Sequence, residues 1–164
     1  MGKFSVAVVA FLTSLVSTSM AKDFNYISTF STSDNIEISG VETAAEIVAA
    51  SEDGQMLIYS DSPMFAVGMI DISDSSEPKP LGFIQLGGEP TSVSVKNGLA
   101  YVGINTSENY VNPTGKLVVI DLETERVVRE TDLGGQPDSV AVAPDGSFVA
   151  VAIENERNED INDE

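Results

Sequence analysis

Histidine and cysteine are both absent from the 164 residues of this chain. Without them the chain cannot build a Ser-His-Asp triad, a Cys-His pair, a phosphohistidine or an ordinary zinc site. It also cannot form a disulfide, so the chain folds without covalent cross-links. Any catalysis by these residues alone would have to use carboxylates or a metal bound by oxygen atoms.

Basic residues are scarce, with 8 Lys and Arg against 26 Asp and Glu and a formal net charge of −18. Such a chain repels phosphate backbones and anionic membranes, so we expect no nucleic-acid partner, and cations or cationic surfaces suit it better. The alternative interpretation is general acidity that keeps the protein soluble, for example in a salty habitat.

One stretch of the chain returns almost unchanged. LGGEPTSVSV, residues 86–95, reappears 47 residues later as LGGQPDSVAV, residues 133–142. A weaker third copy lies upstream, where Asp53-Gly54 precedes Asp145-Gly146 by 92 residues, which is close to two periods. Self-similarity at this period is typical of solenoids and propellers.

Each copy reads as four short strands. Small apolar runs come first (IVAA, SVSV, SVAV), followed by a Gly-containing turn and a second strand (MLIYS, LAYVGIN, FVAVAIE). Continuously apolar third strands (GMIDI, KLVVIDL) and more polar fourth strands (GFIQ, VVRETD) complete the copies. Four strands per copy predict an all-β chain of β-propeller blades, at about 46–86, 87–133 and, incomplete, 134–164. A β-sandwich is the alternative.

Residues 1–21 have the pattern of a secretory signal peptide. Lys3 precedes an apolar run from Phe4 to Val16, and small residues lead to a cleavage point after Ala21. We therefore expect a periplasmic or secreted protein with no membrane span after cleavage. An uncleaved anchor is the alternative, although the run is short for a span of about 20 residues.

The two ends of the remaining chain carry further expectations. Residues 22–45 read as a strand, 22–30, and a loop, and the strand is expected to complete the last blade of a closed ring. Six acids and one arginine make up most of residues 154–164. About two and two-thirds blades are present where a propeller has roughly four to eight, so we expect a fragment of a larger propeller. An acidic tail on a complete domain is the alternative.

Polar loops gather at one end of the predicted blades, because the loops entering first strands and those following second strands emerge together. Such an end is where a rigid scaffold presents a site, and we expect a protein, saccharide or other small-molecule partner there. Oxygen-rich loops also suit Ca²⁺, the one cofactor we consider. The candidate ligands are Asp61, Glu89, Glu108, Asp138, Glu154 and Glu156. Each is alternatively a solvated loop residue, and no EF-hand spacing is present.

Several stretches carry a family resemblance, among them AAEIVAASEDG, LIYSDSP, INTSENYVNPTGKLVVIDL and AIENERNED. Together with the repeated LGG segments they resemble the amino-terminal region of secreted bacterial proteins of the esterase-like activity of phytase family. The chain is also similar to LVIVD and YVTN-type propeller repeats. The resemblance implies an exported β-propeller protein, longer than this chain, with ester or phosphoester hydrolysis in its family name. It carries over no catalytic residue.

Two functions follow from these observations. The first is a binding or scaffold portion of a larger extracytoplasmic protein. The second is part of a Ca²⁺-assisted esterase or phosphoesterase, in which the metal polarises the phosphoryl oxygens and other needed residues lie outside this chain. We favour binding, because basic groups that would hold a phosphate are scarce.

Overall fold

The structure is a computed structural model that describes residues 25–37 and 39–156. The predicted signal peptide and the acidic residues 157–164 lie outside the described residues. Within them, two complete four-stranded sheets and one two-stranded sheet are present. The first sheet holds β1 (Val48–Ala50), β2 (Met56–Asp61), β3 (Ala66–Asp71) and β4 (Lys79–Gln85). The second holds β5 (Glu89–Lys96), β6 (Leu99–Asn105), β7 (Gly115–Asp121) and β8 (Arg126–Asp132), and the third β9 (Pro137–Val142) and β10 (Val149–Ile153).

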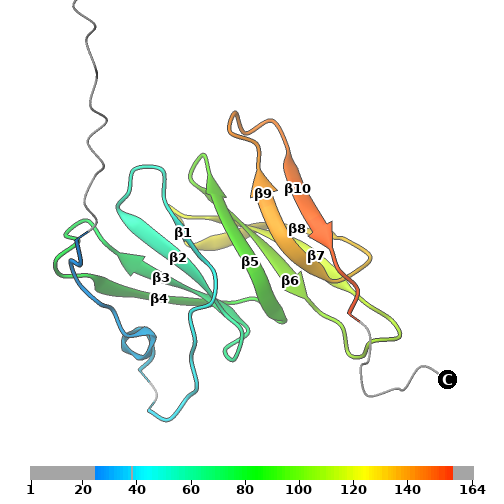
Figure 1. The fold of residues 1–164 in the computed structure, drawn as a ribbon, viewed down its shortest axis with the longest axis horizontal. Coiled ribbons are helices and arrows are strands. Elements are labelled where there is room, and N and C mark those ends of the chain that lie inside the picture. The colour runs from blue at the N-terminus through cyan, green and yellow to red at the C-terminus, as the bar shows by residue number, and fades with distance from the viewer. Residues whose placement is uncertain (1–24, 38, 157–164) are drawn as a thin grey trace, which may run out of the picture.

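Within each sheet, strands that follow one another in sequence pair antiparallel, so each sheet is a meander. The three sheets lie beside one another as successive blades, which we call blades 1, 2 and 3 (Figure 1). In a β-sandwich of Greek-key type the chain would cross between two facing sheets, whereas here consecutive strands stay within one sheet. The all-β, blade-like architecture predicted from the repeat is therefore confirmed.

The turns explain why the copies superimpose on one architecture. Asn97 and Gly98 both have positive φ, 52° and 72°, as the two-residue hairpin between β5 and β6 requires. Gly54 and Gly146 have φ of 70° and 72° at matching places in blades 1 and 3. In both turns the preceding aspartate accepts the N–H of the residue two positions on, at 3.1 and 3.0 Å. Blade 1, the weaker copy in the sequence, therefore has the same turn geometry as blade 3.

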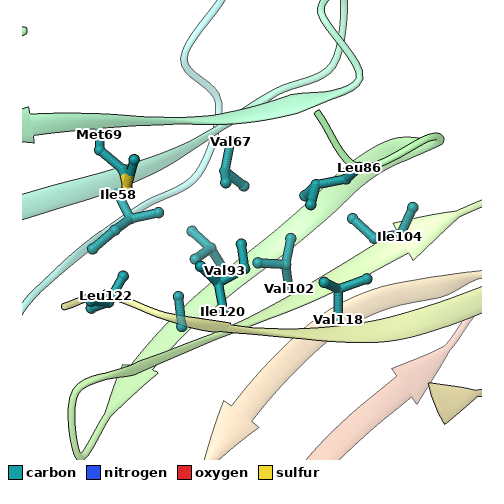
Figure 2. Close-up of a cluster of buried hydrophobic side chains, with 11 residues drawn as sticks. Ile58, Val67, Met69, Leu86, Val93, Val102, Ile104, Val118, Ile120 and Leu122 are labelled. Carbon is teal, nitrogen blue, oxygen red and sulfur yellow. The ribbon is translucent and has the colours of Figure 1, made fainter. Parts of the chain in front are cut away.

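The main core lies between blades 1 and 2 (Figure 2). Side chains alternate along β2, so Ile58 faces blade 2 while Tyr59 faces the opposite side of its sheet. Blade 2 contributes Val93, Val102 and Val118 to this core, one from each of its first three strands. The outermost strand, β8, is exposed along its whole length. In blade 2 the first three strands are therefore largely buried and the fourth is exposed, as in a propeller blade.

The segment before β1 differs from the sequence-based expectation. Residues 25–30 form no strand, and a 3₁₀ turn, Thr32–Asn35, follows them. Asn35 is buried against the face of blade 1 that points away from blade 2. Its amide donates to the Tyr59 hydroxyl (2.9 Å) and the Met69 carbonyl (3.1 Å) and accepts from the Gly82 N–H (3.1 Å). The ring-closing strand stays a prediction, since what this segment contacts here is blade 1.

Asn35 meets blade 1 where its ladder is irregular. The register between β3 and β4 shifts after Met69, so that Leu81 is the extra residue of a bulge and Gly82 takes a φ of 91°. Both backbone groups that Asn35 binds on the sheet belong to the Met69 and Gly82 pair.

No helix among the described residues is long and apolar enough to cross a membrane.

Candidate functional site

The loops that precede β1, β5 and β9 emerge at the same end of the blades as the loops that follow β2, β6 and β10. We call this the loop-rich end. In blade 1 the entering loop bonds to the end of β2, with Glu46 N to Ser60 O at 3.2 Å. In blade 3 the segment after β10 bonds to the entering loop, with Glu154 N to Gln136 O at 2.9 Å. The predicted gathering of loops at one end is therefore present.

The second glycine of each Leu-Gly-Gly motif makes this end compact. A Cβ on Gly88 would lie 2.7 Å from the Asn105 carbonyl oxygen, at the end of β6. A Cβ on Gly135 would lie 2.7 Å from Ile153, at the end of β10. Both distances are shorter than side chains tolerate, so only glycine lets the entering loop run against the end of the second strand. The repeated motif thus sets the shape of the loop-rich end.

Asp61, the first of the predicted calcium ligands, is 3% exposed and tied into its own blade. Its carboxylate accepts the Thr43 hydroxyl and the backbone N–H groups of Ala44 (3.2 Å) and Met64 (3.3 Å). These bonds join the loop entering β1 to the loop after β2. In this arrangement Asp61 holds two loops together.

The other predicted ligands are all exposed: Glu89, Glu108, Asp138, Glu154 and Glu156. Glu89 and Asp138 lie at the starts of β5 and β9, and Glu108 in the loop after β6. Across residues 25–37 and 39–156, no three acidic side chains gather in a group that could hold a metal ion. The Ca²⁺ site stays a prediction, because the described side chains do not form such a site by themselves.

The loop between β6 and β7, residues 106–114, also lies at this end and is held by its own hydrogen bonds. Ser107 Oγ donates to the Thr114 carbonyl at 3.0 Å and accepts the Thr114 N–H at 2.9 Å, which closes the base of the loop. Asn109 accepts the Val111 N–H at 2.9 Å nearer its tip. Tyr110 is nevertheless 50% exposed and Val111 80% exposed. A pinned loop thus presents an aromatic and an aliphatic side chain to solvent.

The opposite end carries the short turns after β1, β5 and β9 and those after β3 and β7, and we call it the turn end. In Figure 1 the turns between β1 and β2, β5 and β6, and β9 and β10 lie along one edge of the molecule. Glu52 of blade 1 accepts from the Lys96 ammonium of blade 2 at 2.6 Å and also from the Asn97 N–H. The Lys96 bond, followed by the Asn97 bond, lowers the pKa of the Glu52 carboxyl.

A cavity of about 710 Å³ opens at the turn end between blades 1 and 2. Its lining includes Met56, Val95 and Leu122 from the two blades and acidic residues from their turns. Sequence reasoning did not find this cavity, because its signal is the packing of one blade on another. Two of the acids that surround it, Asp71 and Asp121, cap turns by accepting the N–H of Ser73 (2.8 Å) and Thr124 (2.8 Å).

These features define a class of protein: a β-propeller-type repeat module with a loop-rich end and an inter-blade cavity. The sequence matches the family described as choice-of-anchor I domain over residues 46–164, and the chain belongs to that family. The family description indicates an extracellular or cell-surface protein. No curated protein matches the sequence.

Solved structures support the fold. The chain is similar to Kuenenia stuttgartiensis hydrazine synthase, with a TM-score of 0.54, 21% identity and coverage of 66% of this chain and 29% of that one. It is also similar to a functionally unknown protein from Desulfotomaculum acetoxidans, with a TM-score of 0.52, 9% identity and coverage of 64% and 31%. The chain therefore spans less than a third of either structure. At these identities the likeness concerns the fold.

Proposed function

We propose that this chain is a binding and scaffold module of an exported β-propeller protein, and that its partner docks on the loop-rich end. The observation that carries the proposal is the 106–114 loop, which is fixed by hydrogen bonds yet exposes Tyr110 and Val111. A rigid aromatic side chain gives a large contact area and loses little conformational entropy when it packs on a partner. Protein surfaces and sugar rings are both suitable partners for it.

Export is part of the same proposal and rests on the pattern of residues 1–21, with cleavage after Ala21. The family description, with its reference to an anchor, supports it. Intact mass and amino-terminal sequencing of the protein recovered from outside the cytoplasm will show Lys22 as the first residue. A product that still begins at Met1 contradicts the proposed cleavage.

Binding is tested with the full chain on a glycan array and, in parallel, by mass-spectrometric identification of proteins captured from the extracellular fraction of its source. The Tyr110→Ala/Val111→Ser variant is expected to lose the specific signal. Phe148→Ala is the matched control, because Phe148 is 63% exposed but lies beside the turn between β9 and β10, at the turn end. Retention of the signal by the loop variant, or equal loss in both, contradicts the proposed docking site.

The second candidate is a Ca²⁺-assisted esterase or phosphoesterase, which the family resemblance and the acidic loops favour. Asp138, at the start of β9, and Glu154, just after β10, lie at the same end of this antiparallel pair; both are exposed to solvent and would be among the ligands. Turnover of p-nitrophenyl phosphate and p-nitrophenyl acetate, with Ca²⁺ and with chelator, tests it. A Ca²⁺-dependent rate that Asp138→Asn abolishes would replace the binding proposal, and the absence of turnover removes this candidate for the chain.

A further inference from the structure

We propose that the cavity at the turn end, between blades 1 and 2, is a docking site for a basic segment of a partner protein. In this arrangement the aliphatic part of a Lys or Arg side chain lies on the cavity floor, and its cationic group meets the acidic rim. The site lies at the end opposite Tyr110 and is independent of the partner proposed there. Its volume, about 710 Å³, is in the range of pockets that hold organic ligands, roughly 300–1,000 Å³.

The floor of the cavity is apolar and belongs to both blades. Met56 and Leu81 come from blade 1, and Val95, Leu99 and Leu122 from blade 2. Leu122 is buried, at one edge of the core cluster (Figure 2), whereas Leu81, the extra residue of the β4 bulge, is 37% exposed. An aliphatic stem placed here would remove apolar surface from water, which favours binding.

The rim is acidic, with six carboxylates from four turns and strand ends: Glu52, Asp53, Asp71, Asp121, Glu123 and Glu125. Glu52 is neutralised by Lys96, and Lys79 and Arg126 are the cross-strand neighbours of Asp71 and Asp121. Three bases thus face six acids. Within the described part of the chain, the carboxylates of Glu123 and Glu125 make no hydrogen bond or ion pair. They are the groups available to an incoming cation.

The spacing of these acids points to an extended polycation. No three of them lie close enough to hold one metal ion. Carboxylates spread around an apolar floor instead match a chain that carries several cations on long aliphatic stems, as Lys and Arg do. Charge complementarity of this kind steers association and fixes register. A basic peptide segment satisfies both the floor and the rim.

The test uses the full chain and a fluorescein-labelled peptide of alternating Lys and Leu, about ten residues long, read by fluorescence anisotropy at about 0.1 M salt. Glu123→Gln/Glu125→Gln is expected to raise Kd about tenfold, since it removes two ion pairs. Glu108→Gln/Asp138→Asn, at the loop-rich end, is the control with the same change in charge and is expected to change Kd less than twofold. Leu81→Ser tests the floor at an exposed position and is expected to raise Kd severalfold while leaving the thermal melt in place.

Three results would overturn the proposal. One is failure of the peptide to bind the unaltered chain. Another is equal weakening by the two double charge variants, which would mean attraction to the general acidity of the protein. The third is a floor variant that binds as tightly as the unaltered chain, which would place the peptide on the surface outside the cavity. None of these results bears on the loop-rich end, so the two proposals fail separately.

Discussion

Replacement of Asn35 by alanine will destabilise the protein more than its small side chain suggests. The change removes the three hydrogen bonds that join the 3₁₀ turn to Tyr59, Met69 and Gly82. Asn35 is 7% exposed, so the groups it leaves behind do not regain water easily. An unpaired buried polar group costs about 1–3 kcal/mol.

The three partners lie together and can relax in part, so we expect a loss of about 2–4 kcal/mol in the free energy of unfolding. This is a large share of the roughly 5–15 kcal/mol that a domain has in total. Urea unfolding followed by circular dichroism measures the loss. Tyrosine fluorescence is a second probe, since the chain contains no tryptophan.

Two further variants separate hydrogen bonding from packing. Asn35→Leu keeps the volume and removes the polar groups, so it should lose about as much as Asn35→Ala. Asn112→Ala makes the same chemical change at an exposed loop position and should stay within about 0.5 kcal/mol of the unaltered protein. An Asn35→Leu variant as stable as the unaltered protein would refute the reasoning, because packing alone would then account for the effect.

Three other predictions follow from the same structure. Gly68→Ala should lower stability by about 1–3 kcal/mol, because the added methyl group collides with the Tyr59 ring, and the midpoint of thermal unfolding will show it. Burial raises the pKa of the Tyr59 phenol. The contribution of the protonated phenol to stability should therefore persist at neutral pH and be lost as the pH rises above about 10, the usual pKa of tyrosine. The difference between the ultraviolet titrations of the unaltered chain and of Tyr59→Phe should have a midpoint above 10, and a midpoint at or below 10 would contradict this prediction. Hydrogen bonds from turn hydroxyls and N–H groups lower the pKa of five turn carboxyls. The contribution of these carboxylates to the stability of the folded state should be present above about pH 4 and be lost as the pH falls through their lowered pKa values. A urea midpoint that stays constant from pH 5 to pH 2 would contradict this prediction. These carboxyls are Asp53, Asp71, Asp74, Asp121 and Asp145.

The strands could be predicted from sequence because each copy repeats a local pattern. LAYVGIN coincides with β6, Leu99–Asn105, and MLIYS lies within β2, Met56–Asp61. The turns carried glycine where positive φ was needed, as at Gly98. Such signals act over a few residues, and three copies reinforce one another.

The remaining features depend on contacts between segments far apart in the chain. Asn35 reads from sequence as one polar residue of an irregular loop, and only the bulge at Gly82 makes it a buried partner. Asp61 likewise reads as a possible ligand, and only the neighbouring Thr43 and Met64 show that it ties loops together. The turn-end cavity depends on how blade 2 sits on blade 1, which periodicity does not encode.

The meander order has a consequence for how this chain folds as it is synthesised. Each blade pairs only strands that follow one another in sequence, so blade 1 can complete its hydrogen bonds while blade 2 is still inside the ribosome. Contacts between blades come later: the buried Ser92 hydroxyl accepts the Val140 N–H, at 3.0 Å, only once β9 has emerged. Each newly synthesised blade would then fold against a preceding blade whose sheet has already formed.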